Sequence, residues 1–351
     1  MTQPVVRVAF LDVGQGDTIV VSVPETREAV VVDCVDADAV LRYLEYSDIK
    51  YLRGVIITHL HLDHCSGIIG LLDNVQSELG MICEMLLCLL PRAKSAQLSV
   101  LLKDADGHSD ANTGPKDLER QRKDVMGQLL RWSKLNYDRF KSLTRETGRT
   151  FPLPGIIDLI HPYEADVPLL IGNSLNDTSG VLIIRGSGST ALLPGDLESP
   201  GWQCLKQNHR DIKSDVLKFP HHGAWSKGDP LDILDTIDPS VVVISVGTNG
   251  VRYGHPNSSV LRAVTSKPGR RVLCTQGTTL CSKSVEAKRD DIINKFKTCP
   301  GHDQNFTLEH GGCPCAGTVI VDLGESPKVI QPSADFHQYH ILLPYYPDHC
   351  C

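Results

Sequence analysis

The sequence predicts an α/β fold, and three observations lead to this prediction. Apolar, β-branched runs such as Val5–Leu11 and Val181–Arg185 have the length and composition of buried strands. Amphipathic segments such as 36–46 alternate with them, and Val40, Tyr43 and Leu44 would share one helix face. Residues with metal-ligand chemistry follow directly after several of the apolar runs. The length of 351 residues allows one large α/β domain or two small ones.

Composition argues against several other classes of protein. The chain is 41% hydrophobic and 22% charged, which is ordinary for a globular protein. Its net charge of −7 gives no global attraction to nucleic acid or to an acidic membrane. No apolar stretch approaches the ~20 residues that span a bilayer, and no export signal is visible. We therefore expect a soluble, cytoplasmic protein in which many of the 12 cysteines are reduced core residues.

A tight polar loop follows the first predicted strand. Strands are expected at Val5–Leu11, Thr18–Val23 and Ala29–Val32. The loop between the first two carries Asp12, Gln15 and Asp17 beside two glycines, and Asp33 ends the third strand. Such loops often hold active-site groups, so Asp12, Gln15 and Asp17 are candidates for contacting substrate or for supporting metal ligands. Physics alone favours a plain hairpin with solvated carboxylates.

The strongest motif follows the predicted buried strand 51–58. It comprises His59, His61, Asp63 and His64. His59 and His61 are two residues apart, so on an extended chain they point the same way. Asp63 and His64 come where the chain turns into a predicted helix over Ser66–Leu72, for which Ser66 could be the cap. Neutral imidazoles and carboxylates bind divalent ions such as zinc, and a surface loop would rarely place four such residues within six positions.

Later strand ends supply further ligand candidates. A hairpin with arms Val181–Arg185 and Thr190–Leu193 ends in Asp196, directly after a glycine. The strand Asp215–Phe219 is followed by the pair His221 and His222. One histidine of the pair should bind metal while the other orients it or touches substrate, and we favour His222 as the ligand.

A third histidine site follows the predicted strand Pro239–Val246. His255 precedes a helix that begins at Ser258. A histidine at a helix N-terminus near a cleft suits contact with a phosphate oxygen or general-acid catalysis. A capping or core histidine is the alternative.

These motifs resemble the metallo-β-lactamase fold. The stretch His59–His64 matches the HxHxDH pattern at every fixed position, Gly195–Asp196 matches the family's GD motif, and His221–Gly223 matches its HHG motif. The stretch Leu11–Asp17 resembles the opening of the metallo-β-lactamase domain of the DNA-uptake protein ComEC and its soluble relatives. The motif Tyr253–Pro256 resembles a later motif of the same domain.

The resemblance implies an αββα sandwich with its active site along one edge. It also implies that Asp196 bridges two metals and that Asp33 takes the place of the family's acidic residue after the third strand. Typical two-metal members carry another histidine before the GD motif. Here the nearest equivalents are Asn176, Asp177, Thr178 and Ser179, and His161 is an earlier alternative. The number of bound ions, one or two, and their identity, zinc or manganese, therefore both stay open. A ligand set with fewer imidazoles favours manganese.

The predicted hydrolase domain covers 1–324 and carries two insertions, with 325–351 as a C-terminal tail of unassigned role. The first insertion, 74–150, contains a predicted strand (85–90), a helix (95–103) and one long amphipathic helix (116–147). Between 116 and 149 there are ten basic and five acidic residues. This excess describes either a solvated helix face or an electropositive rim for a polyanionic substrate.

The second insertion, 281–315, is rich in cysteine and histidine. Cys299, His302, Cys313 and Cys315 resemble a structural zinc site. Cys281 and His310 compete with His302 for the fourth ligand position. Free cysteines in a flexible loop are the alternative.

Together these features predict a metal-dependent hydrolase, most simply a phosphodiesterase or nuclease that attacks DNA or RNA with a metal-activated water. Asp63 could orient or deprotonate that water, and His255 could protonate the leaving group. The alternatives are a small-molecule hydrolase of the lactonase or lactamase type and a non-catalytic metal-binding regulatory subunit. The expected partner is nucleic acid or a nucleotide, with no membrane and with any protein partner unidentified.

Overall fold

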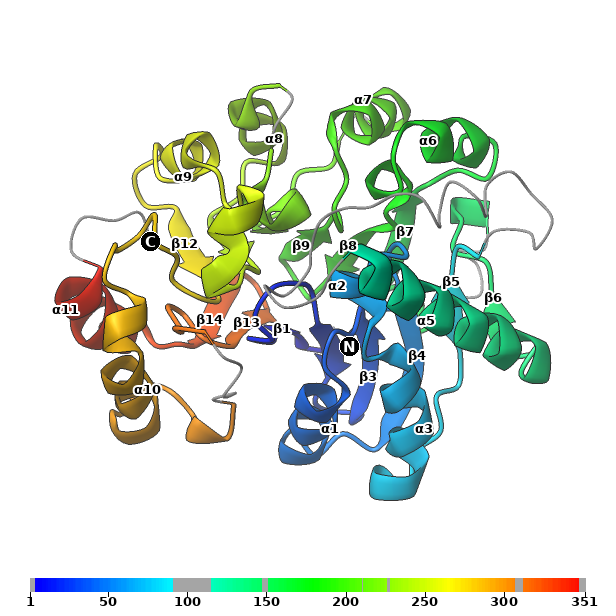
Figure 1. Ribbon diagram of the computed structural model, residues 1–351, viewed down its shortest axis with the longest axis horizontal. Helices are drawn as coiled ribbons and strands as arrows, with labels where there is room; N and C mark the ends of the chain where they lie inside the picture. The colour runs from blue at the N-terminus through cyan, green and yellow to red at the C-terminus, as the bar shows by residue number, and fades with distance from the viewer. Residues whose placement is uncertain are drawn as a thin grey trace.

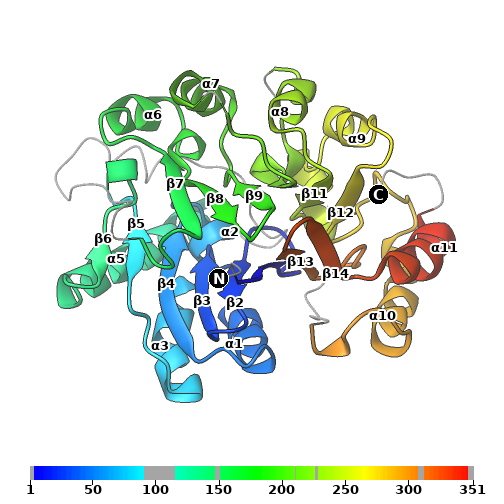
Figure 2. The same ribbon diagram turned by 180° about the vertical axis from the view of Figure 1, so that it is seen from behind.

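Two β-sheets lie face to face with helices on both outer sides (Figures 1 and 2). The computed structural model describes residues 4–90, 115–146, 151–209, 211–225, 228–306 and 312–346. The first sheet has eight strands in the order β14-β13-β1-β2-β3-β4-β5-β6, and the second has six in the order β12-β11-β10-β9-β8-β7. This is the predicted αββα sandwich.

The strands match the predicted apolar runs closely. The first sheet contains β1 (Val6–Phe10), β2 (Ile19–Val23), β3 (Glu28–Val32), β4 (Tyr51–Ile57), β5 (Leu86–Cys88), β6 (Phe140–Lys141), β13 (Val319–Leu323) and β14 (Pro327–Gln331). The second contains β7 (Ile157–His161), β8 (Val181–Arg185), β9 (Thr190–Leu193), β10 (Val216–Lys218), β11 (Val241–Ile244) and β12 (Arg271–Cys274). Strands β3, β4, β5 and β6 are parallel neighbours, as are β9, β10, β11 and β12.

The helices form two outer layers and one end of the molecule. The first sheet is covered by α1 (Ala37–Tyr46), α3 (Ile68–Leu79) and α5 (Pro115–Leu135), with the short α2 (Leu62–Cys65) at the sheet edge (Figure 1). The second is covered by α6 (Val167–Asn173), α7 (Ser199–Asn208), α8 (Pro230–Ile237) and α9 (Ser258–Val264). At one end lie α10 (Arg289–Thr298), the π-helical turn η7 (Phe336–Leu342) and α11 (Leu343–Tyr345).

Three apolar clusters explain why the layers stack in this way. One lies between the sheets, and the other two lie between each sheet and its helices. Strand β3 shows the pattern, since Val30 and Val32 face the other sheet while Ala29 and Val31 face the helices. Both faces of the central strands are therefore buried, which is why their sequences are continuous apolar runs rather than alternating ones.

The segment after β4 differs from the prediction. The chain forms α2 within the histidine motif, where it carries Asp63 and His64, and then the longer α3, instead of one helix over Ser66–Leu72. The Ser66 hydroxyl does not cap a helix, because it donates to the Val35 carbonyl oxygen at 3.1 Å.

The predicted long helix over 116–147 is also shorter in the structure. Helix α5 ends at Leu135, and the chain turns to form β6, which pairs in parallel with β5. The Asn136 side-chain amide donates to the Trp132 carbonyl oxygen at 3.0 Å and closes the last helical turn. Strand pairing therefore ends this helix. The helix predicted at 95–103 lies outside the described residues.

The C-terminal third is more ordered than predicted. Helix α10 lies inside the 281–315 insertion and buries Ile292 and Phe296. Strand β14 pairs with β13, so the chain beyond 324 adds an edge strand to the first sheet. No helix within the described ranges is long and apolar enough to cross a membrane.

The four residues predicted to bind a structural zinc do not form a metal-binding cluster in the structure. Among the described residues, the ligand atoms of Cys299, His302, Cys313 and Cys315 do not converge on one point. The Cys313 thiol donates to the Val285 carbonyl oxygen at 3.4 Å, and Cys315 Sγ lies 3.6 Å from His337 Nε2. The His302 ring packs edge-on against Phe296. His310 lies outside the described residues.

Candidate metal centre

Four buried residues meet at the edge where strands of both sheets end. They come from the loop before β2 (Asp17), α2 (His64), the turn after β9 (Asp196) and the 3-10 turn η3, Pro220–Gly223, after β10 (His222). One ligating atom of each lies within 4.8 Å of those of the other three. We call these four residues the metal-binding group. Asp17 was predicted only as a supporting or substrate-contacting residue.

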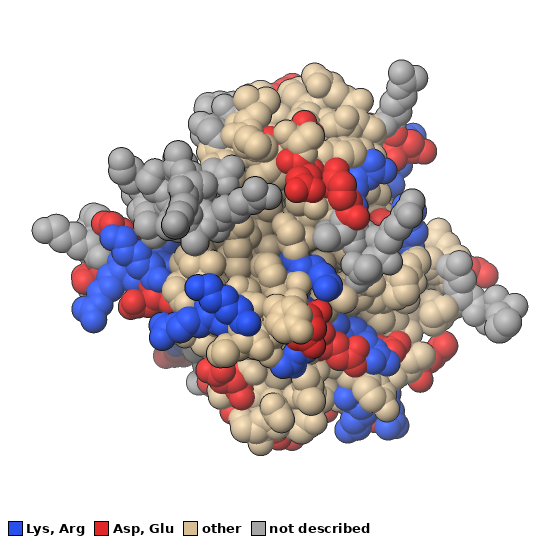
Figure 3. Space-filling model, turned by 90° about the vertical axis from the view of Figure 1, so that its right-hand side faces the viewer, with Lys and Arg blue, Asp and Glu red and all other residues tan. Residues whose placement is uncertain are grey.

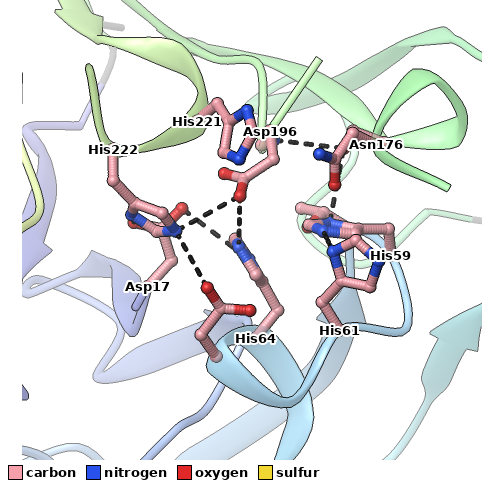
Figure 4. Close-up of polar contacts among 12 residues, drawn as sticks. Asp17, His59, His61, His64, Asn176, Asp196, His221 and His222 are labelled. Carbon is pink, nitrogen blue, oxygen red and sulfur yellow. Dashed lines mark hydrogen bonds and ion pairs between the residues drawn. The ribbon is translucent and has the colours of Figure 1, made fainter. Parts of the chain in front are cut away.

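The Asp196 carboxylate is the centre of this group. Its Oδ2 atom lies 3.1 Å from His64 Nε2 and 3.2 Å from His222 Nε2 (Figure 4). Asp63 is adjacent, with its Oδ2 atom 3.5 Å from His222 Nε2. The turn that presents Asp196 needs glycine at 195, because φ there is +56° and a Cβ would lie 2.9 Å from Ser179 Cβ.

The two histidines of the group are held by their other ring nitrogens. His64 Nδ1 lies 2.7 Å from Asp33 Oδ2, and His222 Nδ1 lies 2.9 Å from the Ser245 carbonyl oxygen. Each contact directs the Nε2 atom toward Asp196 and fixes the ring orientation. Asp33 also accepts hydrogen bonds from the Thr58 amide and hydroxyl, both at 2.7 Å.

The backbone at the histidine pair is strained and decides which histidine joins the group. Both His221 and His222 have φ near +50°, a left-handed conformation that costs about 1–3 kcal/mol in a non-glycine residue. The strained turn buries His222 completely and leaves His221 at the rim. His221 Nδ1 lies 3.2 Å from Glu198 Oε1 instead.

A buried lysine, which was not predicted from the sequence, forms ion pairs with both carboxylates of the metal-binding group. Lys218 in β10 is fully buried and forms ion pairs with Asp17 and with Asp196 Oδ1, the latter at 3.1 Å. Its ammonium also donates to the Gly195 carbonyl oxygen at 2.9 Å. The available signal was a single lysine within an apolar strand, directly before the histidine pair.

Burial and charge shift the pKa values of the group strongly. Burial lowers the pKa of His222, but Asp196 and Asp17 outweigh burial and raise it to about 9. For His64 burial again opposes protonation, and Asp196 and Asp33 raise its pKa well above the ordinary value. Burial raises the pKa of Asp196, while His222, His64 and Lys218 together bring it well below its usual range. Without a metal, the protein therefore gathers positive charge around Asp196.

His59 and His61 lie beside the metal-binding group but are not part of it. His59 Nε2 is 3.1 Å from His61 Nδ1, so the two rings contact each other. Burial lowers the pKa of His61 to about 3, and burial together with the neighbouring imidazoles lowers that of His59 well below its ordinary value. Both rings are consequently neutral at physiological pH, which is the form that binds metal.

The position of the missing third histidine is filled by other contacts. Ser179 Oγ lies 3.3 Å from His59 Nδ1, and the Asn176 amide donates to Glu198 Oε1 at 3.3 Å. Asp177 Oδ1 accepts from the Gly201 amide at 2.9 Å and so braces α7. His161 is not a substitute ligand, since its Nε2 contacts the Asp177 carbonyl oxygen at 2.9 Å.

His255 reaches the edge of the site and is positioned by Gln15. Gln15 Nε2 lies 3.1 Å from His255 Nδ1, and Gln15 Oε1 accepts from the Gly247 amide at 3.1 Å. The His255 ring centre is 5.0 Å from that of His221. Asp12 lies farther back, where Gln276 donates to its Oδ1 at 2.8 Å and burial raises its pKa to about 7.

The metal-binding group has the donor chemistry of a divalent-cation site. Two carboxylates and two imidazoles, all buried, offer oxygen and nitrogen atoms that zinc and manganese both accept. His64 Nε2 and Asp196 Oδ2 lie 3.1 Å apart, and outside the metal-binding group neither atom has a hydrogen-bond partner among the described residues. A cation between them would satisfy both atoms.

Comparison with known proteins agrees with this geometry. Residues 11–78, which include Asp17, Asp33 and the HxHxDH motif, match the family model of the metallo-beta-lactamase superfamily. The chain has the metallo-β-lactamase fold. It is also similar to ComE operon protein 3 of Bacillus subtilis (strain 168), with 26% identity over 323 residues. That match covers 86% of this chain but only 35% of the relative. The metallo-β-lactamase fold and the metal-binding group together support a metal-dependent hydrolase.

Proposed function

We propose that this chain is a metal-dependent phosphodiesterase that cleaves DNA or RNA. The observation that carries the proposal is the buried metal-binding group with its adjoining histidines, an arrangement that supports a hydrolytic centre rather than an isolated structural site. The motif resemblance to the DNA-uptake protein ComEC supports nucleic acid as the substrate. A cytoplasmic location remains a prediction.

The metal would be held by Asp17, His64, Asp196 and His222, and we propose manganese or zinc. When bound, such a cation supplies Lewis-acid chemistry, acidifying water and neutralising charge on the substrate. We do not extend the proposed ligand set to a second ion, because His59 and His61 contact each other and lack a third imidazole.

The protein's own side chains would provide the proton transfers. Asp63, with Oδ2 only 3.5 Å from His222 Nε2, is placed to orient the attacking water and accept its proton. His255 is held through Nδ1 by Gln15 and would donate a proton to the leaving oxygen. Asp33 and Lys218 would act indirectly, by positioning His64 and Asp196.

The test is a metal analysis combined with a substrate panel on the full chain. Chelator-treated protein is reloaded with manganese or zinc and assayed on single- and double-stranded DNA, RNA, cyclic dinucleotides, a lactone and a β-lactam. We expect cleavage of a nucleic acid that Asp196→Ala and His222→Ala abolish, because both residues belong to the metal-binding group. The exposed carboxylate of Asp235 gives a matched control, and Asp235→Ala should keep full activity.

Three outcomes would contradict the proposal. No cleavage of any polynucleotide or cyclic dinucleotide across the metal panel would refute it. Cleavage of the lactone or lactam alone would favour a small-molecule hydrolase. A tightly bound ion without turnover of any substrate would favour a regulatory, non-catalytic role.

A further inference from the structure

The exposed face of α5 is nearly balanced in charge where its side chains are described, despite the basic excess of the sequence. Among these described side chains, the exposed charged ones are four basic and three acidic: Arg120, Lys123, Arg131, Lys134, Asp117, Glu119 and Asp124. Lys123 pairs with Glu119 one turn away. On the side of the molecule in Figure 3, Lys and Arg side chains are interspersed with Asp and Glu rather than forming one continuous positive surface. The exposed face of α5 is therefore a poor candidate for a phosphate-binding rim.

One basic residue of α5 points the other way. Arg122 is only 8% exposed. It stands one turn before Met126 and two turns before Leu129, which belong to the apolar cluster beneath the helix. Residues at this spacing share a helix face, so Arg122 occupies an inward position where an apolar side chain would be expected.

Arg122 lies on the part of α5 that is next to α2, the helix that carries His64. Helix α5 packs on α3, and its first half lies beside α2 (Figure 1). After burial and Asp63, the guanidinium of Arg122 is the next influence on the pKa of His61, and it lowers that pKa. His61 is the N-cap of α2, the helix that carries Asp63 and His64.

One donor of the Arg122 guanidinium is buried without a partner. Arg122 Nε is buried without a hydrogen-bond partner among the described residues. Burying an arginine normally requires a carboxylate or carbonyl to compensate its lost hydration. A planar guanidinium whose Nε donor is unused, on a helix beside α2, matches the oxygen pair of a phosphate.

We propose that Arg122 binds the anionic group of the substrate next to the metal-binding group, where its guanidinium holds the non-bridging oxygens of a phosphodiester. The inference rests on the proposed function for the identity of the anion. Arg122 would select against neutral esters and lactones, which offer no charged oxygen pair. Its role is thus substrate binding, and the metal ligands do not include it.

A binding measurement tests this without relying on turnover. Thymidine 5′-monophosphate is titrated calorimetrically into the manganese-loaded full chain and into Arg122→Gln, Arg122→Lys and Arg120→Gln. Arg120 is the matched control, because it is an exposed arginine on the same helix. Metal content and melting temperature are measured for every variant.

We expect Arg122→Gln to weaken binding at least ten-fold and Arg122→Lys at least three-fold, since lysine keeps the charge but loses the two-pronged geometry. Arg120→Gln should bind as the unmodified chain does. If Arg122→Gln does not fold, Arg122→Lys decides the question. Wild-type affinity in a folded, metal-loaded Arg122 variant would overturn the inference, and so would failure of the unmodified chain to bind the nucleotide. Arg122-dependent binding without phosphodiester cleavage would uphold the inference and refute the proposed function.

Discussion

Replacing Lys218 with methionine probes how the metal centre is held together. The substitution keeps a linear side chain of similar length in β10 but removes a cation that is fully buried between Asp17 and Asp196. It also removes the donor to the Gly195 carbonyl oxygen at 2.9 Å. The two carboxylates would then be left buried without this counter-charge.

The expected loss follows from the cost of breaking a buried ion pair. Removing one partner of such a pair costs about 3–5 kcal/mol. An unfolding entropy of about 2.1 cal/mol/K per residue over 351 residues converts this to a drop of about 4–7 °C in Tm. A divalent cation bound at Asp196 would supply replacement positive charge, so the loss should be smaller in metal-loaded protein than in chelated protein.

Urea unfolding and calorimetry of chelated and metal-loaded samples measure both quantities. Lys267→Met is the control, because Lys267 and Asp238 form a half-exposed surface pair whose loss should cost less than about 1 kcal/mol. The reasoning is refuted if Lys218→Met destabilises the chelated protein no more than Lys267→Met does. Equal losses with and without metal would refute the compensation argument.

Three further predictions concern the residues around the ligands. The folded-state pKa of His222 is raised to about 9, so the stabilisation from this group is complete below pH 6.5 and is lost as the pH rises through 9. In chelated protein, the free energy of unfolding should therefore fall by roughly 3 kcal/mol over this range, as measured by urea unfolding at several pH values. Metal loading should remove this fall. Asp33→Asn should weaken metal binding about 10- to 100-fold in competition with a chelator, because His64 loses the carboxylate at 2.7 Å that orients it; unchanged affinity would contradict this. Gln15→Ala should lower kcat more than it changes KM and should shift the pH profile of kcat, since it releases His255 Nδ1; an unaltered profile would count against a proton-donating His255.

Much of the fold was predictable because its information is local. The strands of the central sheets are runs of β-branched residues buried on both faces, as at β3 and β4, so their positions follow from composition. The N-terminus of α1 follows from Asp36, whose side chain accepts from the Ala39 amide at 2.9 Å. Where long-range pairing competes with local pattern, prediction fails. The amphipathic pattern after Leu135 continues, but the chain leaves the helix to pair β6 with β5.

The HxHxDH motif was also local information. His59, His61, Asp63 and His64 lie within six positions, so a single strand end brings them into one neighbourhood whatever the rest of the chain does. The sequence alone therefore determined that this strand end has metal-ligand chemistry, and it placed Asp196 and the histidine pair as later ligand candidates.

Only the tertiary structure decided which atoms converge. The edge-to-edge meeting of two sheets brings Asp17 into the metal-binding group, and a left-handed turn with the Ser245 carbonyl contact selects His222 over His221. The same packing places Lys218 under Asp196 and turns Arg122 inward from an otherwise ordinary charged helix. These outcomes depend on contacts between residues far apart in the chain and on which side chains lose water when the layers pack. A local pattern of residue types contains neither the long-range contacts nor the burial that results from them.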